Sequence, residues 1–176
     1  MKNSTKLVAT AIAAVAILFG TTNVKAQTKD ENPWRLGIGA EAFVPTGNLN
    51  TISSFGIGGT LRLQYGADKG LAYTLTSGYY DALGKTVPNT SLKYNSFGIV
   101  PLKAGIKAYF ADNIYFGAEA GAGFETATGG STKLLLSPGL GYSSKSWDVG
   151  ARYENFSGQG TSYGLVGLRV AYGFGL

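Results

Sequence analysis

Two residue types that enzymes commonly use as general base and nucleophile are missing from this 176-residue sequence. It contains no histidine and no cysteine. Catalysis by Ser–His, Asp–His or Cys–His pairs is therefore excluded, as are zinc sites with histidine or thiolate ligands. The carboxylates that remain and that fall on one predicted strand face are Glu41, Glu119, Glu125, Asp148 and Glu154. A pair of them could in principle serve as general acid and base.

Basic residues share the predicted face of these carboxylates, which favours a structural role. Charges held away from bulk water must be paired to be tolerated. We therefore predict a structural ion network made of Arg35, Glu41, Arg62, Lys103, Lys107, Glu119, Asp148, Arg152, Glu154 and Arg169. Arg152 and Arg169 are its expected hubs, because a guanidinium can bind a carboxylate through two nitrogens. We predict no catalytic, cofactor or metal site, and no enzyme.

Glycine-rich stretches such as Gly37-Ile-Gly39 and Gly121-Ala-Gly123 do not have the spacing of a phosphate-binding loop. Neither a GxGxxG nor a GxxxxGK run occurs. On the inner face of a narrow barrel, glycine instead makes room for long neighbouring side chains. These glycines therefore indicate packing and not nucleotide binding.

The first 26 residues have the pattern of a secretory signal peptide. A basic start at Lys2 and Lys6 precedes an apolar run over 7–19, and Val24-Lys25-Ala26 fits a small-residue cleavage site. The apolar run is shorter than the ~20 residues that cross a bilayer as a helix. We predict cleavage before Gln27, which makes 27–176 one outer-membrane β-barrel domain.

The composition after Gln27 suits a membrane barrel. Charged residues make up 14% of the sequence, against about 25% in an average soluble domain, while it holds 27 glycines and 11 tyrosines. Removing the signal peptide takes three of the 15 basic residues and none of the 10 acidic ones, so the net charge falls to +2. Nucleic acid is thus not an expected partner.

The chain after residue 27 alternates apolar residues with small or polar ones, which predicts strands with two different faces. Tight turns alternate with longer loops, so the strands should form an antiparallel up-and-down barrel with both termini at the turn end. The eight expected strands are Trp34 to Val44, Phe55 to Tyr65, Leu71 to Tyr80, Asn95 to Phe110, Ile114 to Phe124, Thr132 to Tyr142, Trp147 to Phe156 and Ser162 to Gly175.

The two faces distinguish a membrane barrel from a soluble one. In the last strand Val166, Leu168 and Val170 share one face, whereas Arg169 lies on the other with glycine and alanine. A soluble lipocalin-like barrel would bury the apolar face and place the charges in water. If this chain formed such a soluble barrel, Lys103, Arg169 and other charged residues would lie in an apolar core, and each would destabilise the fold by several kcal/mol. The apolar face is therefore expected to contact lipid.

Aromatic residues gather at both ends of the predicted strands, as interfacial belts do. The expected belt beside the turns consists of Trp34, Tyr65, Phe110, Phe116, Tyr142, Trp147, Tyr172 and Phe174. The expected belt beside the loops consists of Phe43, Phe55, Tyr79, Phe97 and Phe124.

The chain resembles the small eight-stranded outer-membrane β-barrel family, the group that contains OmpX, Ail and the barrel half of OmpA. The resemblance rests on the signal peptide, the eight amphipathic strands and the alternating end with Tyr172, Phe174 and Leu176. It implies location in the outer membrane, lipid as the surrounding partner, and reading of those three residues by the barrel-assembly machinery. The usual terminal residue in that family is Phe, and here it is Leu176.

Three functions are compatible with such a barrel. The first is a non-catalytic structural or interaction role with a side-chain-filled lumen, in which the loop from Asp81 to Tyr94 is the expected contact surface. The second is a narrow passive channel for small or apolar molecules, similar to the OmpW group, if inward glycines such as Gly121 leave the lumen under-filled. The third is an adhesin or an accessory subunit of an envelope complex.

Overall fold

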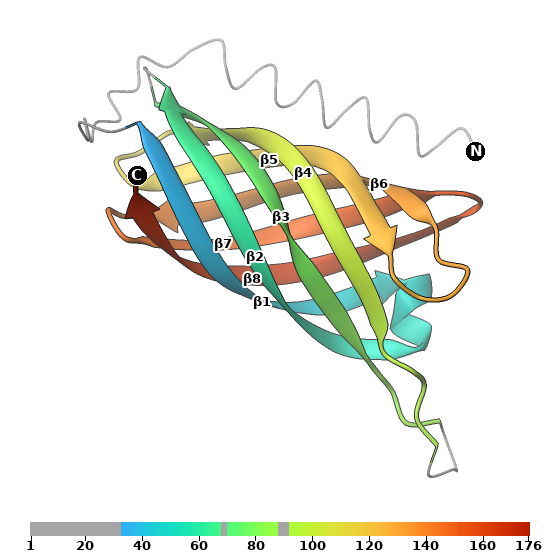
Figure 1. Ribbon diagram of the computed structural model, residues 1–176. Helices are drawn as coiled ribbons and strands as arrows, with labels where there is room; N and C mark the ends of the chain where they lie inside the picture. Colours follow the sequence, from blue (N-terminus) through green and yellow to red (C-terminus); the bar gives the residue numbers. More distant parts are fainter. Residues whose placement is uncertain (1–32, 68–69, 88–91) are drawn as a thin grey trace.

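The computed structural model describes residues 33–67, 70–87 and 92–176. In them, eight antiparallel strands follow one another around a closed barrel, and the last strand pairs with the first (Figure 1). The strands are β1 (Trp34–Gly47), β2 (Ser53–Ala67), β3 (Leu71–Gly84), β4 (Phe97–Tyr109), β5 (Ile114–Glu125), β6 (Thr132–Ser143), β7 (Trp147–Gly158) and β8 (Thr161–Gly175). The predicted fold is confirmed. The predicted signal peptide, 1–26, lies outside the described residues.

At the loop end, β1 and β3 extend the most beyond their predicted ends, by three and four residues. β1 continues through Gly47 because each of its last residues still has a partner on β8, up to the pair Gly47 and Tyr163. β3 continues to Gly84, which pairs with Ser53 of β2. A short 3-10 helix, η1 (Asn48–Thr51), occupies part of the predicted loop between β1 and β2. Within the described part of the chain, no helix is long and apolar enough to cross a membrane.

The faces of the strands follow the predicted alternation. Leu102 and Leu168 expose 46% and 59% of their surface on the outside of the barrel. Their sequence neighbours Lys103 and Arg169 point inward and are almost completely buried. An apolar exterior around a charged interior is the arrangement of barrels that face lipid, and it is the reverse of a lipocalin.

The two ends of the barrel differ. The C-terminus and the β4–β5 and β6–β7 turns lie at one end, which we call the turn end (Figure 1). At the opposite loop end, η1 and the two arms of the hairpin between β3 and β4, 85–87 and 92–96, extend from the barrel, and the arms reach beyond η1 (Figure 1).

Two residues of the predicted loop-side aromatic belt do not face lipid. Phe43 is buried inside the barrel, and Phe97 is partly buried and packs against the same interior cluster. The assignment to the belt was wrong because Phe43 has the inward parity of Glu41 on β1, and Phe97 has that of Lys103 on β4. Phe55, Tyr79 and Phe124 do lie exposed on the outside.

Candidate functional site in the barrel lumen

Nine of the ten residues predicted for the ion network line the lumen, from its middle toward the turn end. Their side chains are exposed by 9% or less. We use the name ion network for these nine, which are Glu41, Arg62, Lys103, Lys107, Glu119, Asp148, Arg152, Glu154 and Arg169. They form nine ion pairs, and several of these join strands that are not hydrogen-bonded neighbours.

Glu119 of β5 is held by two cations and two hydroxyl groups. Its Oε2 lies 3.0 Å from Nη2 of Arg62 and 3.3 Å from Nζ of Lys103. Its Oε1 accepts hydrogen bonds from the hydroxyls of Thr76 at 2.6 Å and Thr74 at 3.2 Å. Both oxygens of this buried carboxylate are therefore satisfied by charge-assisted or hydroxyl donors.

Asp148 of β7 collects cations from three strands. Lys107 of β4 donates to its Oδ2, and Nη1 of Arg169 lies 3.2 Å from its Oδ1. Nη1 of Arg62 lies 3.8 Å from the same oxygen, to which the hydroxyl of Tyr115 donates at 3.0 Å. The Lys107 ammonium also lies 4.2 Å from the centre of the Tyr115 ring, within the range of a cation–π contact.

Arg152 joins the two remaining carboxylates. Its Nε lies 2.9 Å from Glu154 Oε1, and its Nη2 lies 2.5 Å from Glu41 Oε2. Glu154 also accepts from Lys103, and Glu41 lies 3.4 Å from Nε of Arg169. Arg152 and Arg169 each contact two carboxylates, and Arg62 does so as well.

Arg35, the tenth predicted residue, lies beyond Arg169 toward the turn end and is not joined to the others by an ion pair within the described residues. Its Nη1 donates to the backbone oxygen of Ser144 at 2.9 Å and to the hydroxyl of Ser143 at 3.4 Å. Glu125, the fifth inward carboxylate, lies near the loop end instead, where it accepts from the Tyr163 hydroxyl and from the backbone and hydroxyl of Ser131.

This arrangement favours charge compensation over proton transfer. Every carboxylate of the ion network has at least two cationic partners. None of them is therefore a carboxylate without a cationic partner, as a free general base would be. In the described portion of the sequence, no three acidic side chains are grouped so that they could hold a metal ion.

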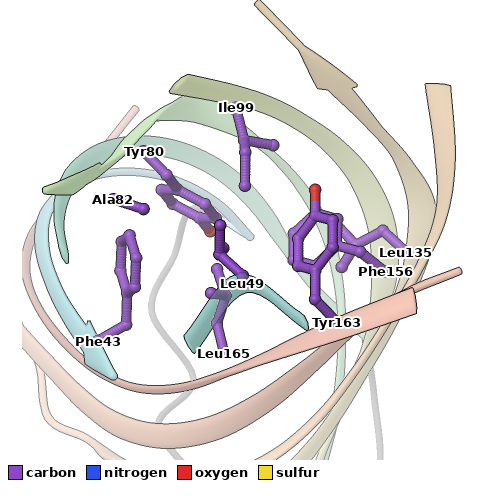
Figure 2. Packing of buried hydrophobic residues seen from close by; sticks show 9 residues of the cluster. All are labelled: Phe43, Leu49, Tyr80, Ala82, Ile99, Leu135, Phe156, Tyr163 and Leu165. Carbon is purple, nitrogen blue, oxygen red and sulfur yellow. The ribbon is translucent and has the colours of Figure 1, made fainter. Parts of the chain in front are cut away.

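Above the ion network, the lumen is apolar at the loop end, which the sequence analysis did not anticipate. We call this cluster the apolar plug; Figure 2 shows its members converging inside the ring of strands. They are Phe43, Leu49, Tyr80, Ala82, Ile99, Leu135, Phe156, Tyr163 and Leu165. Phe156 and Tyr163 stack with ring centres 5.0 Å apart. The Tyr80 hydroxyl connects the plug to the ion network, accepting from Arg152 at 2.9 Å and donating to Glu154 at 3.2 Å.

Two buried residues at the loop end were missed in the sequence. Leu49 of η1 enters the plug from outside the strands and is only 4% exposed. Lys133 of β6 is 2% exposed and donates to the backbone oxygen of Gly158 at 2.8 Å and to the Thr161 hydroxyl at 2.6 Å. It shares the inward parity of Leu135, so the alternation could have identified it. No strand pattern identifies Leu49.

The inward glycines do not leave a passage. The positions where side chains of Gly123, Gly139 and Gly141 would lie are occupied by Phe156, Arg152 and Tyr115. Two small cavities between the lumen side chains of the described residues measure about 30 Å³ and about 10 Å³. Such volumes hold a few waters or a single small ion and form no continuous path through the barrel.

The three residues of the predicted assembly signal lie at the turn end of β8. Tyr172, Phe174 and Leu176 expose 40%, 47% and 56% of their surface on the outside. The Tyr172 ring contacts both Trp147, with centres 5.3 Å apart, and Phe174, at 4.9 Å. Their recognition by an assembly machinery stays a prediction.

The hairpin between β3 and β4 is the most prominent feature of the loop end. Thr86 and Lys93 form a bridge between its two arms, and Tyr94 donates its backbone N–H to Lys85 at 2.9 Å. Lys85 in turn donates to the backbone oxygen of Asn50 in η1, which fixes the base of the hairpin. Leu92 exposes 69% of its surface and Tyr94 exposes 41%.

No protein-family model matches this sequence, and no curated protein matches it. Solved structures do match the barrel. Ail, the attachment invasion locus protein of Yersinia pestis, superposes with a TM-score of 0.61 at 16% identity, over 81% of this chain and 99% of Ail. The chain has the fold of the small eight-stranded outer-membrane β-barrels.

Two further structures agree with this fold assignment. Neisserial surface protein A gives a TM-score of 0.53 at 15% identity, over 81% of this chain and 97% of that protein. The N-terminal β-barrel domain of Pseudomonas aeruginosa OprF gives a TM-score of 0.50 at 15% identity, over 78% of this chain and 97% of that domain. With its apolar exterior, this fold indicates that the barrel resides in the outer membrane.

Proposed function

We propose that this protein is a non-catalytic outer-membrane barrel that does not conduct and that presents the β3–β4 hairpin at the cell surface. The filled lumen is the observation that carries the proposal. The ion network fills its middle, and the apolar plug fills its loop end. A channel would need a continuous water-filled path, whereas the cavities present are of water size.

Lipid is the partner of the outer face, and the barrel-assembly machinery is the proposed partner during biogenesis. The ion network has a structural role in this proposal: it compensates charge inside a barrel whose outside is apolar. The absence of histidine and cysteine from the sequence and the pairing of the lumen carboxylates both support a function other than catalysis.

The β3–β4 hairpin is the proposed interaction surface because it combines reach, an anchored base and exposed side chains. Its base is held by hydrogen bonds to η1 and between its own arms. Leu92 and Tyr94 expose aromatic and aliphatic surface beyond the strands, where a partner can reach it. Loops on rigid scaffolds commonly carry binding functions.

Cysteine labelling tests this display directly, because the protein has no cysteine of its own. The variant Leu92→Cys puts an exposed thiol on the hairpin, and Asp112→Cys puts an exposed thiol at the turn end. In intact cells, a membrane-impermeant maleimide should label only Leu92→Cys, and both should react after lysis. Labelling of Asp112→Cys alone in intact cells would contradict the proposed orientation.

A further inference from the structure

Among the residues that the structure describes, two buried arginine nitrogens have no hydrogen-bond partner, and both belong to residues lining the same small cavity. They are Nη2 of Arg35 on β1 and Nη2 of Arg169 on β8. Arg169 is 2% exposed, so its unpartnered nitrogen cannot turn to bulk water. A buried donor without an acceptor costs roughly 1–3 kcal/mol, and more when it is charged.

The cavity lies at the seam where the barrel closes. Gly37 of β1 and Gly173 of β8 are partners in register, and both line the cavity. A side chain at Gly37 would come within 3.6 Å of Arg169 Nη2, and one at Gly173 would overlap the Arg35 guanidinium. The glycine pair thus leaves a space that both unpartnered nitrogens border.

The charge around this space is positive. Its lining includes the guanidinium groups of Arg35, Arg62 and Arg169 and the single carboxylate of Asp148. That carboxylate is already held by Lys107, Arg169 and Tyr115. The ion network as a whole contains five cations and four carboxylates, so one positive charge has no counterpart within it.

We propose that the cavity binds one small monovalent anion of the halide class, accepted by Nη2 of Arg35 and Nη2 of Arg169. Such an anion supplies the missing acceptor for both nitrogens and the missing negative charge. The volume of about 10 Å³ admits one occupant of roughly water size, which excludes phosphate, carboxylate ligands and lipid headgroups. Arg35 is only half-buried, so the ion enters from the turn end.

Because the two arginines belong to the first and last strands, the bound anion stabilises the closure of the barrel. β1 and β8 are brought together only when the sheet closes. Halide should therefore raise the urea concentration at which the barrel unfolds, beyond the effect of ionic strength. An anion bound at the turn end is compatible with a silent or a conducting barrel, because the apolar plug lies at the opposite end.

The test compares refolded protein in detergent with sodium chloride, sodium bromide or sodium gluconate at equal ionic strength. The unfolding midpoint in urea should be higher in both halides than in gluconate. Gly37→Ala fills the cavity without a clash, since its nearest neighbours would lie at 3.6–3.8 Å, and should abolish this difference. Gly59→Ala, on the outside of β2 with its nearest neighbour at 3.9 Å, should retain it.

A second measurement locates the ion. Crystals grown in bromide should show an anomalous peak between the two Nη2 atoms in the wild type and none in Gly37→Ala. Equal midpoints in halide and gluconate for the wild type, or a halide effect that Gly37→Ala retains, would overturn the proposal. A crystal with water alone at this place in bromide would overturn it as well.

Discussion

At the scale of single residues, the lumen is defined by charges that meet across the barrel. Arg62 on β2 contacts Glu119 on β5, and Lys103 on β4 contacts Glu154 on β7, although neither pair of strands is hydrogen-bonded. A buried charge is tolerated only when it is paired in this way, and removing one partner leaves the other charge buried without a counterion. Each carboxylate therefore matters through the cations that it neutralises.

The substitution Glu119→Gln should lower the free energy of unfolding by about 3–5 kcal/mol, because Arg62 and Lys103 both lose a charged partner. Urea unfolding of the refolded barrel, followed by tryptophan fluorescence, measures the change. Glu125→Gln is the matched control on the same strand. Glu125 accepts only uncharged donors in the structure, so its change should be clearly smaller. Equal losses would contradict the assignment of Glu119 to the ion network.

The sequence allows the inward position of these charges to be predicted, but not their partners. Parity along each strand assigns Lys103 and Glu119 to the inside, because a strand has a period of two residues. Which of them meet depends on strand tilt and stagger around the closed barrel. The separation of Arg35 from the network also depends on this geometry.

At the scale of elements, η1 closes the loop end by carrying Leu49 into the apolar plug. The inward residues Phe43, Ile99 and Phe156 are of the same types as the residues that face lipid, so composition alone could not distinguish the two sets. Parity identifies them as inward, but an apolar interior runs against the usual polar lumen of membrane barrels. The alternation of inward and outward residues could not identify Leu49, because Leu49 lies outside the strands.

Leu49→Ala should destabilise the barrel by about 2 kcal/mol, at the low end for a buried leucine because a short loop helix can partly relax. The urea midpoint reports this loss. Limited proteolysis should also cut faster near residues 48–52, since η1 loses its anchor. Leu92→Ala, on the exposed hairpin, should change stability by no more than ~0.5 kcal/mol. Resistance of η1 to proteolysis in Leu49→Ala would contradict its anchoring by Leu49.

At the scale of the whole molecule, the outer surface forms an apolar band bordered by aromatic residues. Leu102 lies midway along β4 and is 46% exposed on this surface. A charged side chain at this position should therefore destabilise the barrel as much as a charge at the centre of a bilayer does. The alternation and, apart from Phe43 and Phe97, the aromatic belts predicted this arrangement from the sequence, because lipid contact imposes it on every strand.

Leu102→Arg should reduce stability in lipid vesicles by about 2–4 kcal/mol, the range for arginine at the bilayer midplane. Leu92→Arg makes the same exchange on the hairpin beyond the strands and should cost ~0–1 kcal/mol. The comparison uses reversible urea unfolding in vesicles. Similar costs at both positions would show that Leu102 does not lie at the level of the bilayer centre.

The filled lumen is the central claim, and single-channel recording tests it most directly. The chain without its predicted signal peptide, 27–176, is refolded into a planar bilayer, and its insertion is verified by heat-modifiable migration in electrophoresis. With the ion network and the apolar plug in place, the inserted barrel should be electrically silent across the voltage range in which the bilayer is stable. Discrete, reproducible openings from a folded barrel would contradict the account and favour the narrow channel.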